Sequence, residues 1–150
     1  MRSILFILTF ACIATNGHAQ TATDSIKATI SKLFDGMKNA DAALLKSAFA
    51  DSAILQTINR DKQGNTVIGT EAIGEFADFV SKQTKGDADE RISYDVIRVD
   101  ANLAIAWTPY QFYYKGKFSH CGVNSFQLVR FNGEWKIQYL IDTRRKAGCE

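Results

Sequence analysis

The residue in this sequence that is best suited to chemistry is His120. Its imidazole titrates near neutral pH, so it can act as a general acid or base, or as a hydrogen-bond partner of a ligand. Asp95 is the carboxylate that could orient it, provided that Asp100–Asn102 closes as a three-residue loop. A structural histidine, bonded to the backbone near a sheet edge, is the alternative. Both roles stay open at the level of sequence.

Aromatic and amide side chains accompany His120 on the predicted strands and could line a pocket. The aromatic rings could stack on a flat ligand, and a buried tyrosine needs a partner for its hydroxyl group. The same rings could also form ordinary core. The predicted ligand is a small apolar or aromatic molecule, whose identity stays open. The predicted contact residues are Trp107, Gln111, His120, Asn124, Phe126 and Tyr139.

The last predicted strand ends in charged residues. Asp142 and Arg144 lie on one face of it, either as an exposed ion pair or with an arginine closing over an anionic ligand at the pocket mouth. Glycine-rich phosphate loops, Gly-x-Ser-x-Gly elbows and paired-carboxylate signatures are absent from the sequence. We therefore predict no cofactor.

Cys121 and Cys149 are the two cysteines that remain after removal of an N-terminal leader, and in an oxidising compartment they would form a disulfide. The tail beyond Arg145 must then fold back over the sheet, which Gly148 makes easier. A Cys–His nucleophilic pair is not expected, because His120 and Cys121 are adjacent in a strand and point to opposite faces. A zinc site would lack a fourth ligand, so no metal site is predicted.

Met1–Ala19 has the features of a secretory signal peptide: a basic start at Arg2, a short apolar run, and small residues before a cleavage point at Gln20. The run is shorter than the about 20 residues of a membrane span. Cys12 suggests a lipoprotein instead, but the residues before it fit a lipobox poorly. Arg2 is the only charged residue of the leader, so its removal leaves 17 basic and 16 acidic residues. The sequence predicts a periplasmic or secreted protein with no nucleic-acid or membrane partner.

Residues 20–150 have the length of one domain. Apolar residues at helical spacing predict three helices, over Thr23–Lys38, Ala42–Phe49 and Glu71–Lys82. Asp41 and Thr70 are the predicted caps of the second and third helices. A hairpin of Ala53–Ile58 and Thr66–Ile68 separates these two helices, and Thr84–Arg91 is predicted to be a charged loop. Four strands follow, so the fold class is α+β.

The turns between these four strands are well marked. Asn132-Gly133 between two apolar runs is the strongest short hairpin signal, and Lys115-Gly116 marks a second hairpin. With two-residue loops, Phe126 pairs with both Ile105 and Tyr139, so His120 and the other predicted contact residues share one face. The opposite face collects Tyr110, Phe112 and Tyr114. A single β-bulge would exchange the two faces beyond it.

Four motifs spread along the chain resemble the nuclear transport factor 2-like superfamily, which includes ketosteroid isomerase and SnoaL-type polyketide cyclases. They are Asn39-Ala40-Asp41, Phe49-Ala50-Asp51-Ser52-Ala53, Gly69-Thr70-Glu71-Ala72-Ile73 and Phe131-Asn132-Gly133-Glu134-Trp135-Lys136-Ile137. Through Ile141–Arg145 and His120-Cys121-Gly122, the chain looks most like small secreted bacterial members labelled lumazine-binding-like. The resemblance covers nearly all of Thr23–Arg145. It implies a cone-shaped, cystatin-like fold, with three helices on a strongly bent antiparallel sheet, an apolar pocket, and a homodimer packed through the sheet.

The chemistry of the isomerase does not carry over to this chain. Its tyrosine falls on Leu33, its base on Thr57, and its second acid near Ser125 or Gln127. Three hypotheses follow. The first is a small-molecule-binding domain, and the second is an enzyme of cyclase, isomerase or dehydratase type that uses His120 with Asp95. The third is an interaction module that docks a protein through the sheet face with Tyr110, Phe112 and Tyr114.

Overall fold

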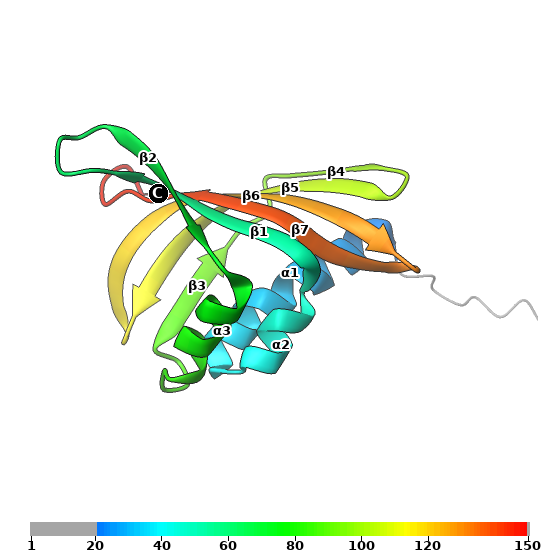
Figure 1. Ribbon diagram of the computed structural model, residues 1–150, viewed down its shortest axis with the longest axis horizontal. Coiled ribbons are helices and arrows are strands. Elements are labelled where there is room, and N and C mark those ends of the chain that lie inside the picture. Colours follow the sequence, from blue (N-terminus) through cyan, green and yellow to red (C-terminus); the bar gives the residue numbers. More distant parts are fainter. Residues whose placement is uncertain (1–20, 150) are drawn as a thin grey trace, which may run out of the picture.

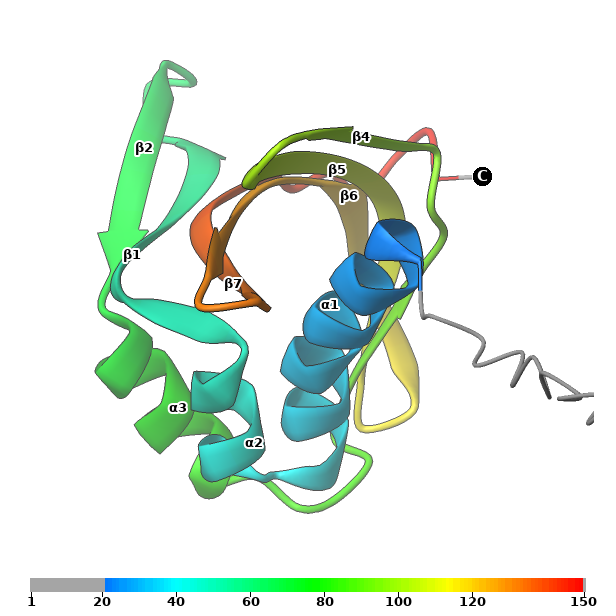
Figure 2. The same ribbon diagram turned by 90° about the vertical axis from the view of Figure 1, so that its right-hand side faces the viewer.

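A computed structural model of the chain describes residues 21–149, so the predicted leader lies outside the described residues. Three helices pack against the concave side of one long, strongly bent sheet (Figure 1). The sheet arches over an interior that the helices close from the other side (Figure 2). This is the α+β architecture that the sequence predicts. Within residues 21–149, no helix combines the length and the apolar composition that crossing a membrane requires.

The helices lie close to their predicted positions. They are α1 (Ala22–Asn39), α2 (Ala42–Ser47) and α3 (Ile73–Ser81). Asp41 caps α2 as predicted, because its carboxylate accepts a hydrogen bond of 2.9 Å from the backbone N–H of Leu44. The predicted start of α3 at Glu71, with a Thr70 cap, is wrong. Both residues pair with the neighbouring strand and so extend the hairpin.

One seven-stranded sheet forms the other layer. Its strands are β1 (Phe49–Arg60), β2 (Thr66–Glu71), β3 (Ala88–Ile92), β4 (Val96–Asp100), β5 (Leu103–Tyr114), β6 (Lys117–Phe131) and β7 (Glu134–Thr143). The order is β2-β1-β7-β6-β5-β3, and β4 pairs with the other half of β5. The predicted meander is present as β4 to β7. The pair β1–β7 is parallel, whereas a wholly antiparallel sheet was the expectation.

Strand β3 corrects the prediction of a charged loop over Thr84–Arg91. Asp89 and Arg91 form an ion pair of 2.9 Å on one side of the strand. Ala88, Glu90 and Ile92 alternate with them, and Ala88 and Glu90 line the interior. Apolar residues at every second position would predict a strand here. This pattern is interrupted because the central residue that faces the interior is Glu90.

Two bulges set which residues face the interior. Tyr114 pairs with Lys117 as predicted, but Phe112 then pairs with His120, which leaves Ser119 as an extra residue on β6. Phe126 therefore pairs with Ala106 instead of the predicted Ile105. Every side chain of β5 beyond the bulge lies on the opposite face from the prediction.

The second bulge exchanges the two faces of β7 beyond Ile137. Leu128 pairs with Ile137 as predicted, but Gln127 pairs with Tyr139, which leaves Gln138 unpaired in the ladder. Phe126 is paired with Leu140 and not with the predicted Tyr139. As a result, Leu140 and Asp142 take the inward positions.

The C-terminal tail is joined to β6 as the sequence predicts. Cys121 and Cys149 form a disulfide with a Cα–Cα distance of 5.7 Å. Arg145 and Cys121 also exchange two backbone hydrogen bonds, of 2.9 and 2.8 Å, so pairing with β6 continues past the end of β7. Gly148 has φ +64°, a left-handed conformation that suits glycine in the returning tail. These contacts hold the backbone on both sides of Arg144.

Candidate functional site

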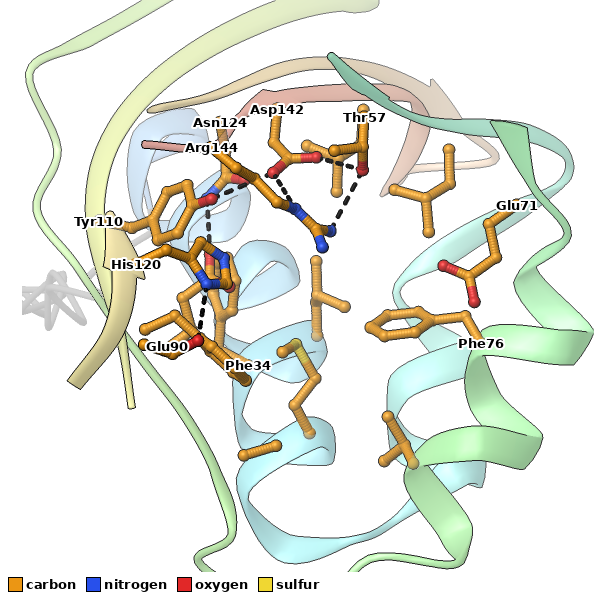
Figure 3. Close-up of a pocket in the computed structure, with 18 of the residues that line it drawn as sticks. Phe34, Thr57, Glu71, Phe76, Glu90, Tyr110, His120, Asn124, Asp142 and Arg144 are labelled. Carbon is orange, nitrogen blue, oxygen red and sulfur yellow. Dashed lines mark hydrogen bonds and ion pairs between the residues drawn. The ribbon is translucent and has the colours of Figure 1, made fainter. Parts of the chain in front are cut away.

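A cavity of about 580 Å³ lies between α1, α3 and the concave side of the sheet (Figure 3). Most of its wall is apolar. The apolar lining is Leu33, Phe34, Met37, Leu55, Phe76, Phe79, Val80, Ala88, Phe112 and Leu140. Polar groups come chiefly from the strands. The main ones are Thr57, Glu71, Glu90, Tyr110, His120, Asn124, Asp142 and Arg144. Such a cavity has the size and the mixed lining of a small-molecule site.

Asp142 is the centre of a hydrogen-bond network on the cavity wall. Its Oδ1 accepts a bond of 2.6 Å from the Thr57 hydroxyl, and its Oδ2 accepts one of 3.1 Å from the Tyr110 hydroxyl. Arg144 Nε donates to the same Oδ2 at 3.0 Å, and Arg144 Nη2 donates to Thr57 Oγ1 at 3.1 Å. Asp142 and Arg144 form the predicted ion pair, but only its arginine side is exposed, because Asp142 is buried. The network holds the Arg144 side chain in the cavity lining.

Tyr110 reaches this network because of the residue that faces it on β6. Its hydroxyl also lies 2.9 Å from the carbonyl oxygen of Thr143. Gly122 pairs with Tyr110, and a Cβ on Gly122 would lie 2.7 Å from the tyrosine ring. Burial, together with the charges of Asp142 and Glu90, raises the pKa of Tyr110. The hydroxyl therefore stays protonated and can donate.

Glu90 approaches the cavity from β3. Asn124, which is buried, donates a hydrogen bond of 2.8 Å from Nδ2 to Glu90 Oε1. Burial raises the pKa of Glu90 to about 7, and the negative charge of Asp142 adds to this effect, while Asn124 and Arg144 oppose it. The carboxyl group is thus close to half protonated at neutral pH.

His120 lines the same cavity. Its ring packs against Phe112 and Tyr110 at centroid distances of 5.0 and 5.7 Å, and its Nδ1 lies 3.1 Å from Ser119 Oγ. Burial lowers the pKa of His120, and Arg144 contributes in the same direction. The imidazole is therefore neutral at pH 7.

Asp95 does not orient His120. It is exposed in the segment between β3 and β4, where its backbone N–H donates to the carbonyl oxygen of Trp107 at 3.1 Å. The charged groups that act on His120 are instead Arg144, Asp142 and Lys146. The bend between β3 and β4 places Asp95 outside the cavity lining.

The other predicted contact residues divide between three places. Asn124 lines the cavity, whereas Phe126 is fully buried in the core, where its ring meets Phe34 edge-on. Trp107, 46% exposed, and Tyr139 lie on the convex face, and the Tyr139 hydroxyl donates to Gln56. Gln111 pairs with Cys121, which is also outside the main cavity. The two bulges are the reason, since they exchange the faces of β5 and of the end of β7.

Sequence reasoning missed Glu90 and Tyr110 as cavity residues. Glu90 lies in a run of charged residues. The only sequence feature that indicates its inward orientation is its position between Ala88 and Ile92, at the two-residue spacing of a strand. Tyr110 was placed on the wrong face. Within residues 21–149 there is no group of three or more His, Cys, Asp and Glu side chains that could hold a metal ion.

Comparison with known proteins identifies the fold. A family model described as "Putative lumazine-binding" matches residues 21–139. No curated protein matches the chain. Among solved structures, an NTF2-like protein of unknown function from Shewanella baltica has a TM-score of 0.64 and 16% identity, over 83% of this chain and 94% of that one. A protein of unknown function with a cystatin-like fold from Nostoc punctiforme has a TM-score of 0.65 and 14% identity, over 85% and 95% of the two chains.

A function-unknown protein from Mycobacterium tuberculosis is also similar, with a TM-score of 0.61 and 15% identity, over 87% of this chain and 79% of that one. At these identities the likeness establishes the fold alone. The predicted cone-shaped, NTF2-like fold is confirmed.

Proposed function

Because this chain belongs to the family described as "Putative lumazine-binding", within the NTF2-like superfamily, we propose that it is a binding domain for a small molecule with an apolar body and one polar end. The observation that carries the proposal is the division of the cavity lining. Apolar side chains of α1 and α3 form one part of it, and the polar groups around Asp142, Arg144 and Glu90 form another. A ligand with this polarity leaves few polar groups unpaired on either side.

Lumazine itself matches a cavity lining that is apolar on one side and polar on the other less well than a more apolar bicyclic molecule does. It carries nitrogen and oxygen atoms around most of its edge, and several of these would face Leu33, Phe34, Met37 and Phe76. Burying polar atoms without a hydrogen-bond partner costs free energy. The favoured ligand class is therefore an aromatic or alicyclic molecule with one carbonyl or hydroxyl edge.

A titration with 2-tetralone, a bicyclic ketone, and with lumazine tests this function. We expect saturable binding of 2-tetralone that the Phe79→Ala substitution weakens about tenfold, by removing roughly 1.4 kcal/mol of apolar contact. Phe131→Ala is the matched control, since Phe79 and Phe131 are 53% and 46% exposed but only Phe79 lines the cavity. Isothermal titration calorimetry gives both affinities. No saturable binding of either compound, or an equal loss in both variants, contradicts the proposal.

The protein would act outside the cytoplasm. The signal-peptide pattern of Met1–Ala19 supports this location, and so does the disulfide between Cys121 and Cys149, since such bonds persist in oxidising compartments.

The protein would assemble as a homodimer through the convex face of the sheet. The aromatic face considered first for this role carries Tyr110 and Phe112, which instead line the cavity. The convex face exposes large apolar residues, which are Leu103, Ile105 and Trp107 on β5, and Ile54 on β1 at the other side of β6 and β7. A row of exposed large apolar side chains along one strand, as on β5, is typical of an interface.

We expect the wild-type protein to be a dimer and Trp107→Glu to be a monomer at micromolar concentration. A carboxylate buried in an apolar interface costs several kcal/mol, which corresponds to a rise of more than about 100-fold in the dissociation constant. Light scattering coupled to size-exclusion chromatography measures both masses. Phe79→Glu, at an equally exposed aromatic residue on the helical side, should stay dimeric. A dimeric Trp107→Glu protein would place the interface elsewhere.

A further inference from the structure

Two carboxylates of the cavity lining have no cationic partner in the described part of the chain. Asp142 forms an ion pair of 3.0 Å with Arg144, which is the one cationic side chain among the described residues that line the cavity. Glu71 and Glu90 form no ion pair within residues 21–149. Because the charges of Asp142 and Arg144 offset each other, the lining carries a net negative charge once Glu71 and Glu90 are ionised.

Glu90 has one carboxyl oxygen left for a bound molecule. Its Oε1 accepts the hydrogen bond of 2.8 Å from Asn124, and its Oε2 takes no hydrogen bond from residues 21–149. Glu90 is partly exposed, and it lines the cavity. A carboxylate that is largely removed from water is stabilised by a donor that also carries positive charge. An ammonium group supplies both.

Aromatic rings accompany the two carboxylates. Glu90 and His120 lie on one wall of the cavity, across from Phe76 and Glu71 (Figure 3). Phe34 also lines the cavity. An aromatic ring attracts a cation that lies over its face within about 6 Å of its centre. A lining that combines carboxylates with aromatic rings therefore favours an organic cation over a neutral molecule of the same shape.

The titratable and charged groups around Glu90 come mainly from the strands, because the side chains that α1 and α3 contribute to the lining are apolar. They are Tyr110 on β5, His120 on β6, Asp142 on β7, Arg144 just after β7, and Glu71 at the end of β2. The negative charge of Asp142 raises the pKa of Glu90, whereas Arg144 lowers it. Tyr110 stays protonated and His120 stays neutral at pH 7, so neither offsets the negative charge.

We propose that the cavity selects ligands that carry a protonated amine at their polar end, and that Glu90 binds this ammonium group. This inference rests on the proposed function, since it specifies the charge of the molecule that the cavity takes. The ammonium group donates a hydrogen bond to Glu90 Oε2. The Arg144 guanidinium, which extends into the space between the two walls, remains available to a carbonyl or hydroxyl oxygen on the same polar end (Figure 3). The apolar body packs against α1 and α3.

Three bicyclic compounds that share one carbon frame test the proposal. They are 2-aminotetralin, 2-tetralone and 1,2,3,4-tetrahydro-2-naphthoic acid, which are cationic, neutral and anionic at pH 8. By isothermal titration calorimetry at this pH, we expect the amine to bind the wild-type protein at least about tenfold more tightly than the ketone. The acid should bind more weakly than the ketone, because its charge has the same sign as that of the lining.

Proton release on binding identifies Glu90 as the partner of the amine. The pKa of Glu90 is about 7, so its carboxyl group is close to half protonated at pH 7, and an ammonium group needs the ionised form. Binding of 2-aminotetralin at pH 7 should therefore release about half a proton, whereas 2-tetralone should release almost none. Titrations in two buffers with different ionisation enthalpies measure this. Lowering the pH from 8 to 6 should weaken amine binding about tenfold, and protonation of His120 acts in the same direction.

The Glu90→Gln variant should lose both the preference for the amine and the proton release. Glu75→Gln is the matched control and should keep both, since Glu75 lies in the first turn of α3 outside the cavity lining. Saturable binding of 2-tetralone without tighter binding of the amine, or tightest binding of the acid, overturns this inference and leaves the binding function intact. Absence of binding of all three compounds overturns both. The comparison of the three compounds uses the wild-type protein, so it does not depend on how the variant folds.

Discussion

Replacing Glu90 with glutamine is expected to raise the free energy of unfolding by about 3 kcal/mol at pH 8 and to leave it nearly unchanged at pH 4. The cause is the buried carboxyl group. Its pKa is about 7 in the folded protein, against an ordinary value of 4.5 for an accessible glutamate. The folded state therefore holds the proton more tightly than the unfolded state. Well below pH 4.5, Glu90 is protonated in both the folded and the unfolded state. Its ionisation then has no effect on the stability of the wild-type protein.

As the pH rises from about 4.5 to about 7, the unfolded chain gives up this proton first, so the wild-type protein loses stability. Above pH 7 the loss levels off, and a difference of 2.5 pKa units corresponds to about 3 kcal/mol. Glutamine stays neutral at every pH, so the variant lacks this slope. Its amide can also accept the hydrogen bond from Asn124 that Glu90 accepts.

Urea denaturation at a series of pH values between 4 and 8 measures the effect. Glu75→Gln, at an exposed position on α3, should keep the wild-type pH profile. Equal slopes for wild type and Glu90→Gln would mean that Glu90 titrates normally and would contradict this prediction. The measurement needs no ligand.

Replacing Gly122 with alanine is expected to cost at least about 4 kcal/mol of stability. A Cβ at this position would lie 1.8 Å from the carbonyl oxygen of Thr143 and 2.7 Å from the ring of Tyr110. Neither contact is possible without movement of the backbone of β6 or β7. Glycine is needed here because Thr143 and Tyr110 lie too close to leave room for a side chain, and both are packed into the sheet.

The same substitution would disturb the cavity. The Tyr110 hydroxyl donates a hydrogen bond of 2.9 Å to the carbonyl oxygen of Thr143. The Thr143 hydroxyl accepts one of 3.2 Å from the N–H of Val123. Pushing these groups apart would release Tyr110 from Asp142. We therefore expect the Gly122→Ala protein to bind 2-tetralone less tightly, if it folds.

Gly69→Ala is the matched control for this effect. Gly69 is also in a strand, but the nearest atoms to its added Cβ are Asn59 Nδ2 at 3.6 Å and Thr57 O at 3.9 Å, which are ordinary contacts. Its stability should stay within about 1 kcal/mol of wild type. Urea denaturation compares the two variants, and soluble yield serves if Gly122→Ala does not fold. A Gly122→Ala protein as stable as the control would show that the strands can separate without cost.

The sequence by itself determined the helices, the tight turns, the disulfide and the fold class. The disulfide follows from the two cysteines that remain after the predicted leader, and the other features depend on local chemistry: apolar residues at helical spacing in α1, the side chain of Asp41 at the start of α2, and Asn132-Gly133 at a hairpin. The superfamily motifs follow the same elements, so they too could be recognised before any contact between distant residues was known.

Only the tertiary structure decided which side chains line the cavity. The side chains of a strand alternate between faces, so one extra residue at Ser119 and one at Gln138 moved Trp107 and Tyr139 outside and brought Tyr110 and Asp142 inside. Neither bulge has a local signal in the sequence, because each is set by how the bent sheet pairs over its whole length. The burial of Glu90 is likewise a property of the assembled layers. A glutamate between charged residues has no unusual chemistry until α1 and the sheet remove it from water.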